Sequence, residues 1–215
     1  HAPRVGLLQG DRIADLQASV AATLTRRGVV RAAEIAASLV PASTRQFLEG
    51  GAATQDAVAA ITEWVTVSAA SARLHAPIAD PGKFICIGLN YRDHAEESEL
   101  EIPAVPVVFS KWPGCLVGHG AEVVIPHEET RPDYEAELAV IIGRTAKNVR
   151  KADALSYVAG YSCFNDGTLR DYQRKTSQWT IGKNFDATGG FGPYFVSADE
   201  APAGAVGLAI RSKLN

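Results

Sequence analysis

The chain of 215 residues changes character across a short stretch rich in proline and glycine, residues 77–82 (PIADPG). Before this stretch the sequence is rich in alanine, and its apolar residues recur with helical spacing. After it, short apolar runs alternate with turn residues, which is the pattern of strands in a sheet. We therefore expect a small N-terminal domain over residues 1–80 and a larger domain over residues 81–215.

The N-terminal part combines a hairpin signal with helical segments. A Gly-Asp pair at residues 10–11 separates two short apolar runs within residues 5–16, which is typical of a β-hairpin. Farther along, Ser43 can cap a short helix that ends at residues 50–51, and Val58, Ile61 and Val65 share a helical face. These patterns predict a small α/β domain that serves as a scaffold.

The part after residue 80 reads as β-rich, with only short helices between its strands. The expected strands cover residues 83–89, 107–110, 122–125, 134–142, 160–165 and 193–196. Residues 206–215 also have strand character, and the sequence stops there. We therefore expect an α+β, β-rich chain that is truncated at its C-terminus and whose larger domain is incomplete.

Composition narrows the class of partner. The net charge is −3 and the sequence contains no basic block, which argues against a nucleic acid or an anionic membrane as partner. No apolar run reaches the length of a membrane span and no signal-peptide core opens the chain, so we expect a cytoplasmic protein that binds small molecules. Cys86, Cys115 and Cys163 are odd in number and widely spaced, and we expect buried thiols instead of disulfides or a zinc site.

The segment 132–143 (PDYEAELAVIIG) carries the clearest chemical signal. Read as a strand, it places Glu135 and Glu137 on one face, about 7 Å apart, with Ala139 and Ile141 continuing that face. Like charges held close beside apolar groups repel one another, and a divalent cation relieves that cost. Oxygen ligands favour Mg²⁺ or Mn²⁺. The alternative is a solvated charged face on an edge strand.

A third oxygen ligand is available where the apolar strand 160–165 ends. Asp166 follows this strand at the point where a sheet opens into a loop, and we expect it to join the two glutamates. Its simpler interpretation is an Asp-Gly turn. Asp171 is the competing ligand, but it lies in an expected short helix, where pairing with Arg170 or Arg174 is the simpler outcome.

Two further segments contain candidate catalytic groups. If residues 90–97 turn helical, Glu97 lies on the same side as His94 and can orient it as a general base. Lys183 lies among apolar residues before a glycine-rich stretch and can stabilise an enolate by its charge. The alternatives are a surface or capping histidine and a solvated lysine.

Taken together, four segments resemble the fumarylacetoacetate hydrolase family. They are residues 88–97 (GLNYRDHAEE), 106–120 (PVVFSKWPGCLVGHG), 132–143 and 160–196. The resemblance implies that Glu135, Glu137 and Asp166 hold Mg²⁺ or Mn²⁺, and that His94 with Glu97 activates water on a lid-like segment. It also implies that Arg170, Gln173 and Lys183 line the substrate site. The implied fold is a mixed β-sandwich roll preceded by a smaller N-terminal domain, and the implied assembly is a homodimer.

These observations predict a metal-dependent hydrolase that cleaves a C–C bond in an acylpyruvate or fumarylpyruvate-like substrate, such as a product of aromatic catabolism. The same groups can stabilise an enolate without using water, so an oxo-acid decarboxylase, isomerase or dehydratase is the close alternative. A non-catalytic binding module is a third hypothesis, which the candidate site residues argue against.

Overall fold

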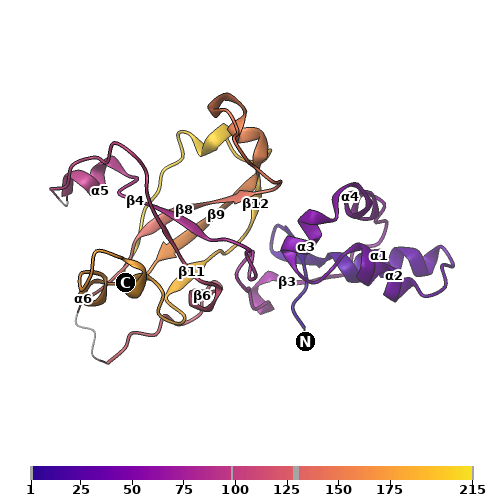
Figure 1. Ribbon diagram of the computed structural model, residues 1–215. Coiled ribbons are helices and arrows are strands. Elements are labelled where there is room, and N and C mark those ends of the chain that lie inside the picture. Colours follow the sequence, from indigo (N-terminus) through magenta and orange to yellow (C-terminus); the bar gives the residue numbers. More distant parts are fainter. Residues whose placement is uncertain (1, 98, 128–130, 215) are drawn as a thin grey trace.

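The structure is a computed structural model that describes residues 2–97, 99–127 and 131–214 (Figure 1). The N-terminal elements and the elements after residue 80 gather on opposite sides of the view in Figure 1. None of the helices in the described part of the chain combines the length and the hydropathy needed to cross a membrane.

The N-terminal elements form a three-stranded antiparallel sheet in the order β1-β2-β3 with four helices. They are β1 (Gly6–Gln9), β2 (Arg12–Asp15), α1 (Leu16–Arg26), α2 (Ala32–Leu39), α3 (Thr44–Glu49), α4 (Gly51–Ala59), β3 (Thr66–Ser68) and a 3₁₀ helix (Ala69–Ser71). The expected hairpin is confirmed as β1 and β2. Ser43 caps α3 as predicted, because its hydroxyl accepts a hydrogen bond from the Gln46 amide over 3.4 Å.

A separate apolar core holds these helices together. Leu16 and Val20 of α1 pack with Val5, Ala36 and Val40, all of which are buried. The Asp15 carboxylate caps α1 by accepting a hydrogen bond from the Ala18 amide over 2.9 Å. The division of the chain near residue 80 stays a prediction.

The remainder of the chain is built mainly from short strands. Its elements are β4 (Ile85–Gly88), α5 (Arg92–Glu97), β5 (Val107–Ser110), a 3₁₀ helix (Pro113–Cys115), β6 (Leu116–Val117), β7 (Pro132–Asp133), β8 (Ala136–Ile142), a 3₁₀ helix (Lys151–Tyr157), β9 (Val158–Asp166), β10 (Thr168–Leu169), α6 (Arg170–Gln173), α7 (Thr180–Lys183), β11 (Gly189–Phe191), β12 (Val196–Ser197) and a 3₁₀ helix (Ala203–Ala205). The content is mixed α and β, as expected.

The long strand β9 organises this part. It pairs with β8 along one edge and with β11 and β12 along the other, while β11 continues in parallel to β6. Two small two-stranded sheets, β4-β5 and β7-β10, complete the strand pairing. Phe164 of β9, Phe191 of β11 and Ile78 form the buried core, and Ala139 and Ile141 of β8 pack against it.

Several expectations about strands and thiols are wrong. Residues 122–125 and 206–214 form no strand, and residues 193–196 contribute only the first residue of β12; residue 215 lies outside the described part. An apolar run becomes a strand only when another strand supplies its backbone hydrogen bonds, and these segments lack such a partner among the described strands. Cys163 is exposed, because it points from β9 to the face opposite the core, whereas Cys115 is buried and Cys86 is half-buried.

Candidate functional site

The antiparallel pairing of β8 with β9 brings Glu135 and Asp166 together. Ala136 pairs with Asn165, so the residues just before β8 lie beside the last residue of β9. The Asp166 amide donates to the Glu135 carbonyl over 3.0 Å, and the Glu135 amide donates to the Asn165 side chain over 3.2 Å. Glu135 and Glu137 are both half-buried, which confirms that these glutamates do not lie on a freely solvated surface.

Lys183 lies between two of the predicted metal ligands. Its Nζ donates to Glu135 Oε2 over 2.9 Å and to Asp166 Oδ2 over 2.8 Å. The side chains of Lys183 and Asp166 are only 2% and 3% exposed, and that of Glu135 is 17% exposed. Because desolvated opposite charges interact strongly, these ion pairs define the centre of the site.

Lys111 is a second buried lysine at this centre, and sequence reasoning missed it. Its Nζ donates to Asp166 Oδ1 over 2.7 Å and also contacts the carbonyls of Gly167 and Lys183. The side chain is fully buried. A sequence signal exists, since Lys111 directly follows the apolar strand β5 in the same way that Asp166 terminates β9.

Arg170 and Gln173 of α6 extend the network from the other side of Glu135. The Arg170 guanidinium donates to Glu135 Oε1 over 2.7 Å and to Gln173 Oε1 over 2.9 Å. It also donates to Asp133 Oδ2 from two nitrogens, over 2.9 and 2.8 Å. Sequence reasoning missed Asp133, which is a carboxylate two residues before Glu135 in the same segment.

Glu137 lies near this network, in surroundings that disfavour the charged form of its carboxyl group. Burial, together with repulsion from Glu135 and Asp166, raises its pKa to about 7. A hydrogen bond with the Tyr91 hydroxyl opposes the shift, and Tyr91 in turn accepts a hydrogen bond from the Leu138 amide over 3.2 Å. Tyr91 is the residue directly before α5, and its hydroxyl therefore connects this segment to β8.

His94 and Glu97 lie on α5 and are not brought to the carboxylates. Figure 1 shows α5 at the edge of the molecule, on the side away from the N-terminal helices. His94 is half-buried and Glu97 is exposed, and within the described residues no hydrogen bond or ion pair joins the two. The predicted helix is therefore present, but the predicted interaction between His94 and Glu97 is not formed among the described residues.

Asp171 lies in α6, as expected, and outside the Lys183 network. Its carboxylate lies 3.9 Å from Arg131 Nε, which is an ion pair with a residue other than the predicted partners Arg170 and Arg174. Arg170 instead faces Asp133 and Glu135, because its side chain leaves α6 toward β7 and the start of β8.

The carboxylates fit a hard divalent cation by their chemistry. They offer only oxygen donors, and the raised pKa of Glu137 reflects crowding of negative charge that such an ion would relieve. In the described part of the chain, no group of three His, Cys, Asp or Glu side chains has the arrangement needed to hold a metal ion. Each carboxylate oxygen of Glu135 and Asp166 already accepts a bond from a cationic side chain, so an ion would compete with Lys183 for these atoms.

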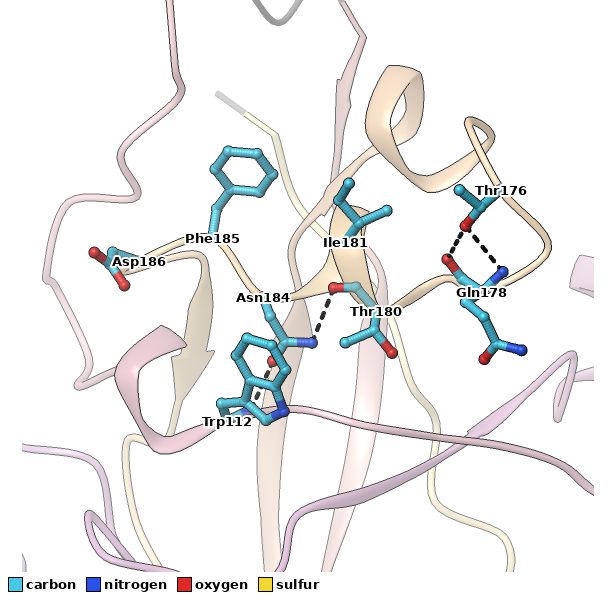
Figure 2. A pocket seen from close by; sticks show the side chains of 8 residues that line it. All are labelled: Trp112, Thr176, Gln178, Thr180, Ile181, Asn184, Phe185 and Asp186. Atoms are coloured by element: carbon cyan, nitrogen blue, oxygen red, sulfur yellow. Dashed lines mark hydrogen bonds between the residues drawn. The ribbon is translucent and has the colours of Figure 1, made fainter.

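A cavity of about 550 Å³ lies beside the site but is not lined by its charged groups. Trp112, Ile181 and Phe185 supply apolar walls, and Asn184 lies between them (Figure 2). Trp112 and Asn184 are the direct chain neighbours of the two buried lysines. The cavity therefore borders the segments that carry the lysines, while the ammonium groups themselves face the carboxylates.

Comparison with known proteins finds relatives for most of this chain. The family model described as "Fumarylacetoacetate (FAA) hydrolase C-terminal" matches residues 83–215. The chain is 47% identical over 133 residues to a fumarylacetoacetate hydrolase domain-containing protein 2 homolog from Dictyostelium discoideum, which covers 61% of this chain and 43% of that relative. It is 40% identical over 164 residues to oxaloacetate tautomerase fahd2, mitochondrial, from Xenopus laevis, covering 74% of this chain and 51% of that relative.

A solved structure extends the similarity over nearly the whole chain. Maleylpyruvate hydrolase from Sphingobium sp. SYK-6, in complex with manganese(II) ion and pyruvate, matches with a TM-score of 0.65 at 25% identity. The match covers 93% of this chain and 66% of that chain. The chain spans about half the length of the curated relatives it matches.

Proposed function

This chain belongs to the fumarylacetoacetate hydrolase family, and we propose that it acts on a 2-oxo acid by stabilising its enolate. The reaction we propose is hydrolysis of the C–C bond between two carbonyl groups of an acylpyruvate-like substrate. The observation that carries the proposal is Lys183 Nζ, buried between Glu135 Oε2 and Asp166 Oδ2. A desolvated ammonium at a cluster of carboxylates is suited to stabilising negative charge that develops on a substrate oxygen.

We propose that Glu135, Glu137 and Asp166 bind Mg²⁺ or Mn²⁺. When bound, a divalent ion supplies Lewis-acid chemistry toward the oxygens of a 2-oxo acid and fixes their position. The buried pair of Asp166 with Lys111 and the half-buried pair of Glu135 with Arg170 hold both carboxylates in place. The manganese in the maleylpyruvate hydrolase structure supports this choice of ion.

The other side chains divide between binding and proton transfer. Arg170 and Gln173 lie together on α6 and, with Lys183, would contact the substrate. His94, oriented by Glu97, would take a proton from the attacking water. This last role requires α5 to approach the carboxylates, and Tyr91 supplies the anchor for such a movement, because it already contacts β8 through the Leu138 amide.

Isomerisation of an oxo acid is the second candidate. Two observations favour it. The match to the tautomerase from Xenopus laevis covers 74% of this chain at 40% identity, and no hydrogen bond or ion pair joins His94 to Glu97 among the described residues. Keto–enol exchange needs a stabilised enolate but no activated water, so the Lys183 cluster would suffice for it.

One comparison of substrates separates the two candidates. With Mg²⁺ or Mn²⁺ present, we expect hydrolysis of acetylpyruvate to pyruvate and acetate. His94→Ala should lower this rate by about 10²–10⁴-fold, the range for a lost general base, while ketonisation or decarboxylation of oxaloacetate survives better. Turnover of oxaloacetate without any hydrolysis of acetylpyruvate would reject the hydrolase and favour the second candidate. A chain that turns over neither acid would favour a non-catalytic binding module.

The remaining expectations belong to the same proposal. We propose that the β8–β9 sheet is part of a mixed β-sandwich roll, that the division lies near residue 80 and that the protein is a homodimer. A cytosolic location is also our proposal, and the relatives from Xenopus laevis and Homo sapiens are named mitochondrial proteins.

A further inference from the structure

One amide side chain joins the two backbone segments that carry the buried lysines. Asn184 Nδ2 donates to the carbonyl of Ser110 over 3.0 Å and to the carbonyl of Thr180 over 3.1 Å. Its Oδ1 accepts from the Trp112 amide over 2.6 Å. Figure 2 shows this side chain between Trp112 and Thr180. Asn184 therefore bonds to the residue before Lys111, to the residue after Lys111 and to the first residue of α7.

Helix capping alone does not account for this arrangement. Asn184 is the C-cap residue of α7, and its bond to Thr180 is a local one, four residues back in the chain. The other two bonds cross to a segment more than 70 residues away in sequence. An asparagine is suited to this position, because its amide offers two donors and an acceptor within one short side chain.

The bonds of Asn184 bear on where the two ammonium groups lie. Lys111 and Lys183 donate to different oxygens of Asp166, over 2.7 and 2.8 Å, and Lys111 also contacts the Lys183 carbonyl. The position of each ammonium group therefore depends on the separation of the 110–112 segment from α7. The Asn184 side chain bridges these two segments.

We propose that Asn184 is a positioning residue that holds Lys111 and Lys183 in register at Asp166. This inference rests on the proposed function, because it assigns Asn184 a role in the reaction through Lys183. Asn184 itself has no contact with the carboxylates among the described residues.

The first test reads the lysines directly and needs no substrate. Amine acylation followed by peptide mass spectrometry measures how accessible Lys111 and Lys183 are, with the exposed Lys147 as internal reference. In Asn184→Ala we expect both buried lysines to react about 10-fold faster. The variant loses the net stabilisation of one to two hydrogen bonds between the joined segments, so these segments open more often. Gln178→Ala, which removes an exposed amide from the wall of the same cavity, should leave them protected.

A second variant covers the case in which Asn184→Ala does not fold. Asn184→Asp keeps the acceptor for the Trp112 amide and loses both donors. We therefore expect Lys183 to be acylated faster in this variant than in the unmodified chain, as in Asn184→Ala. Protection of both lysines in a folded Asn184 variant, or equal exposure in Gln178→Ala, would overturn the proposal.

Kinetics with the metal-loaded protein then test the role in the reaction. On whichever of acetylpyruvate and oxaloacetate the unmodified chain turns over, we expect Asn184→Ala to lower kcat by about 10- to 10²-fold, the loss typical of a misplaced catalytic group, with a smaller change in KM. Exposed lysines with unchanged kcat would overturn the role in the reaction. Exposed lysines in a chain that turns over neither acid would reject the proposed function and leave the structural role of Asn184 standing.

Discussion

Lys183 Nζ donates to Asp166 Oδ2 over 2.8 Å, and both side chains are almost completely withdrawn from solvent. Withdrawing two charges from water is costly, and good geometry with additional hydrogen bonds is needed to offset that cost. Asp166 meets this requirement with Lys111 on its other oxygen, and Lys183 meets it with Glu135. This pairing places a desolvated cation beside a desolvated carboxylate at the centre of the proposed site.

Removing the Lys183 charge should destabilise the protein. We expect Lys183→Met to lower the free energy of unfolding by about 3 kcal/mol, because loss of one partner leaves buried carboxylates uncompensated, although Asp166 keeps Lys111. Mn²⁺ should recover more stability in this variant than in the unmodified chain, since the ion would no longer compete with the lysine. Denaturant unfolding with chelator and with Mn²⁺ measures both effects. A loss no larger than that of Lys147→Met, an exposed control, would contradict the role of the pairing.

Glu137 should make stability depend on pH below neutrality. Its folded pKa of about 7 lies above the ordinary value of 4.5, so between these values the folded chain binds more protons than the unfolded chain. The contribution of Glu137 to stability therefore decreases as pH rises through this window. Glu137→Gln should be more stable than the unmodified chain at pH ~8 by on the order of 1 kcal/mol, discounted because the side chain is only half-buried, and equally stable near pH ~4. Unfolding in the presence of chelator checks this, and a difference that is independent of pH would refute it.

The thiols should differ sharply in reactivity. Burial, with a smaller contribution from the nearby Asp166 charge, raises the pKa of Cys86 to about 12, so little thiolate exists at pH ~8. Cys163 is exposed on β9. We expect iodoacetamide to alkylate Cys163 at least about 10²-fold faster than Cys86, as the thiolate requirement implies. Peptide mass spectrometry over a time course measures this ratio, and comparable rates would show that Cys86 is not enclosed beside the cluster.

Local interactions explain what could be predicted from the sequence. The β1-β2 hairpin and the Ser43 cap each depend on a few neighbouring residues, so composition and spacing identify them. The inward face of β8 was also predictable, because strand periodicity alone places Glu137 beside Ala139 and Ile141.

Long-range contacts explain what could not. Lys111 pairs with Asp166, 55 residues away in the chain, and its position directly after β5 does not specify that partner. Residues 206–214 have apolar character suited to a strand, but strand formation requires a partner that local sequence does not specify. His94 and Glu97 have helical spacing on α5, yet their position relative to the carboxylates depends on how the segment packs.

Titration of the metal itself tests the central claim, that Glu135, Glu137 and Asp166 form a site for a divalent ion beside Lys183. Calorimetric titration with Mn²⁺ should show one binding event in the unmodified chain. Glu135→Ala, Glu137→Ala and Asp166→Ala should each weaken it by more than about 10²-fold, because loss of a ligand costs more than the ~10–100-fold typical of an outer partner. Asp171→Ala deletes a carboxylate on the neighbouring α6, and this variant should bind Mn²⁺ as the unmodified chain does. Unchanged affinity in the Glu135 or Glu137 variant, or equal loss in the Asp171 variant, would contradict the assignment.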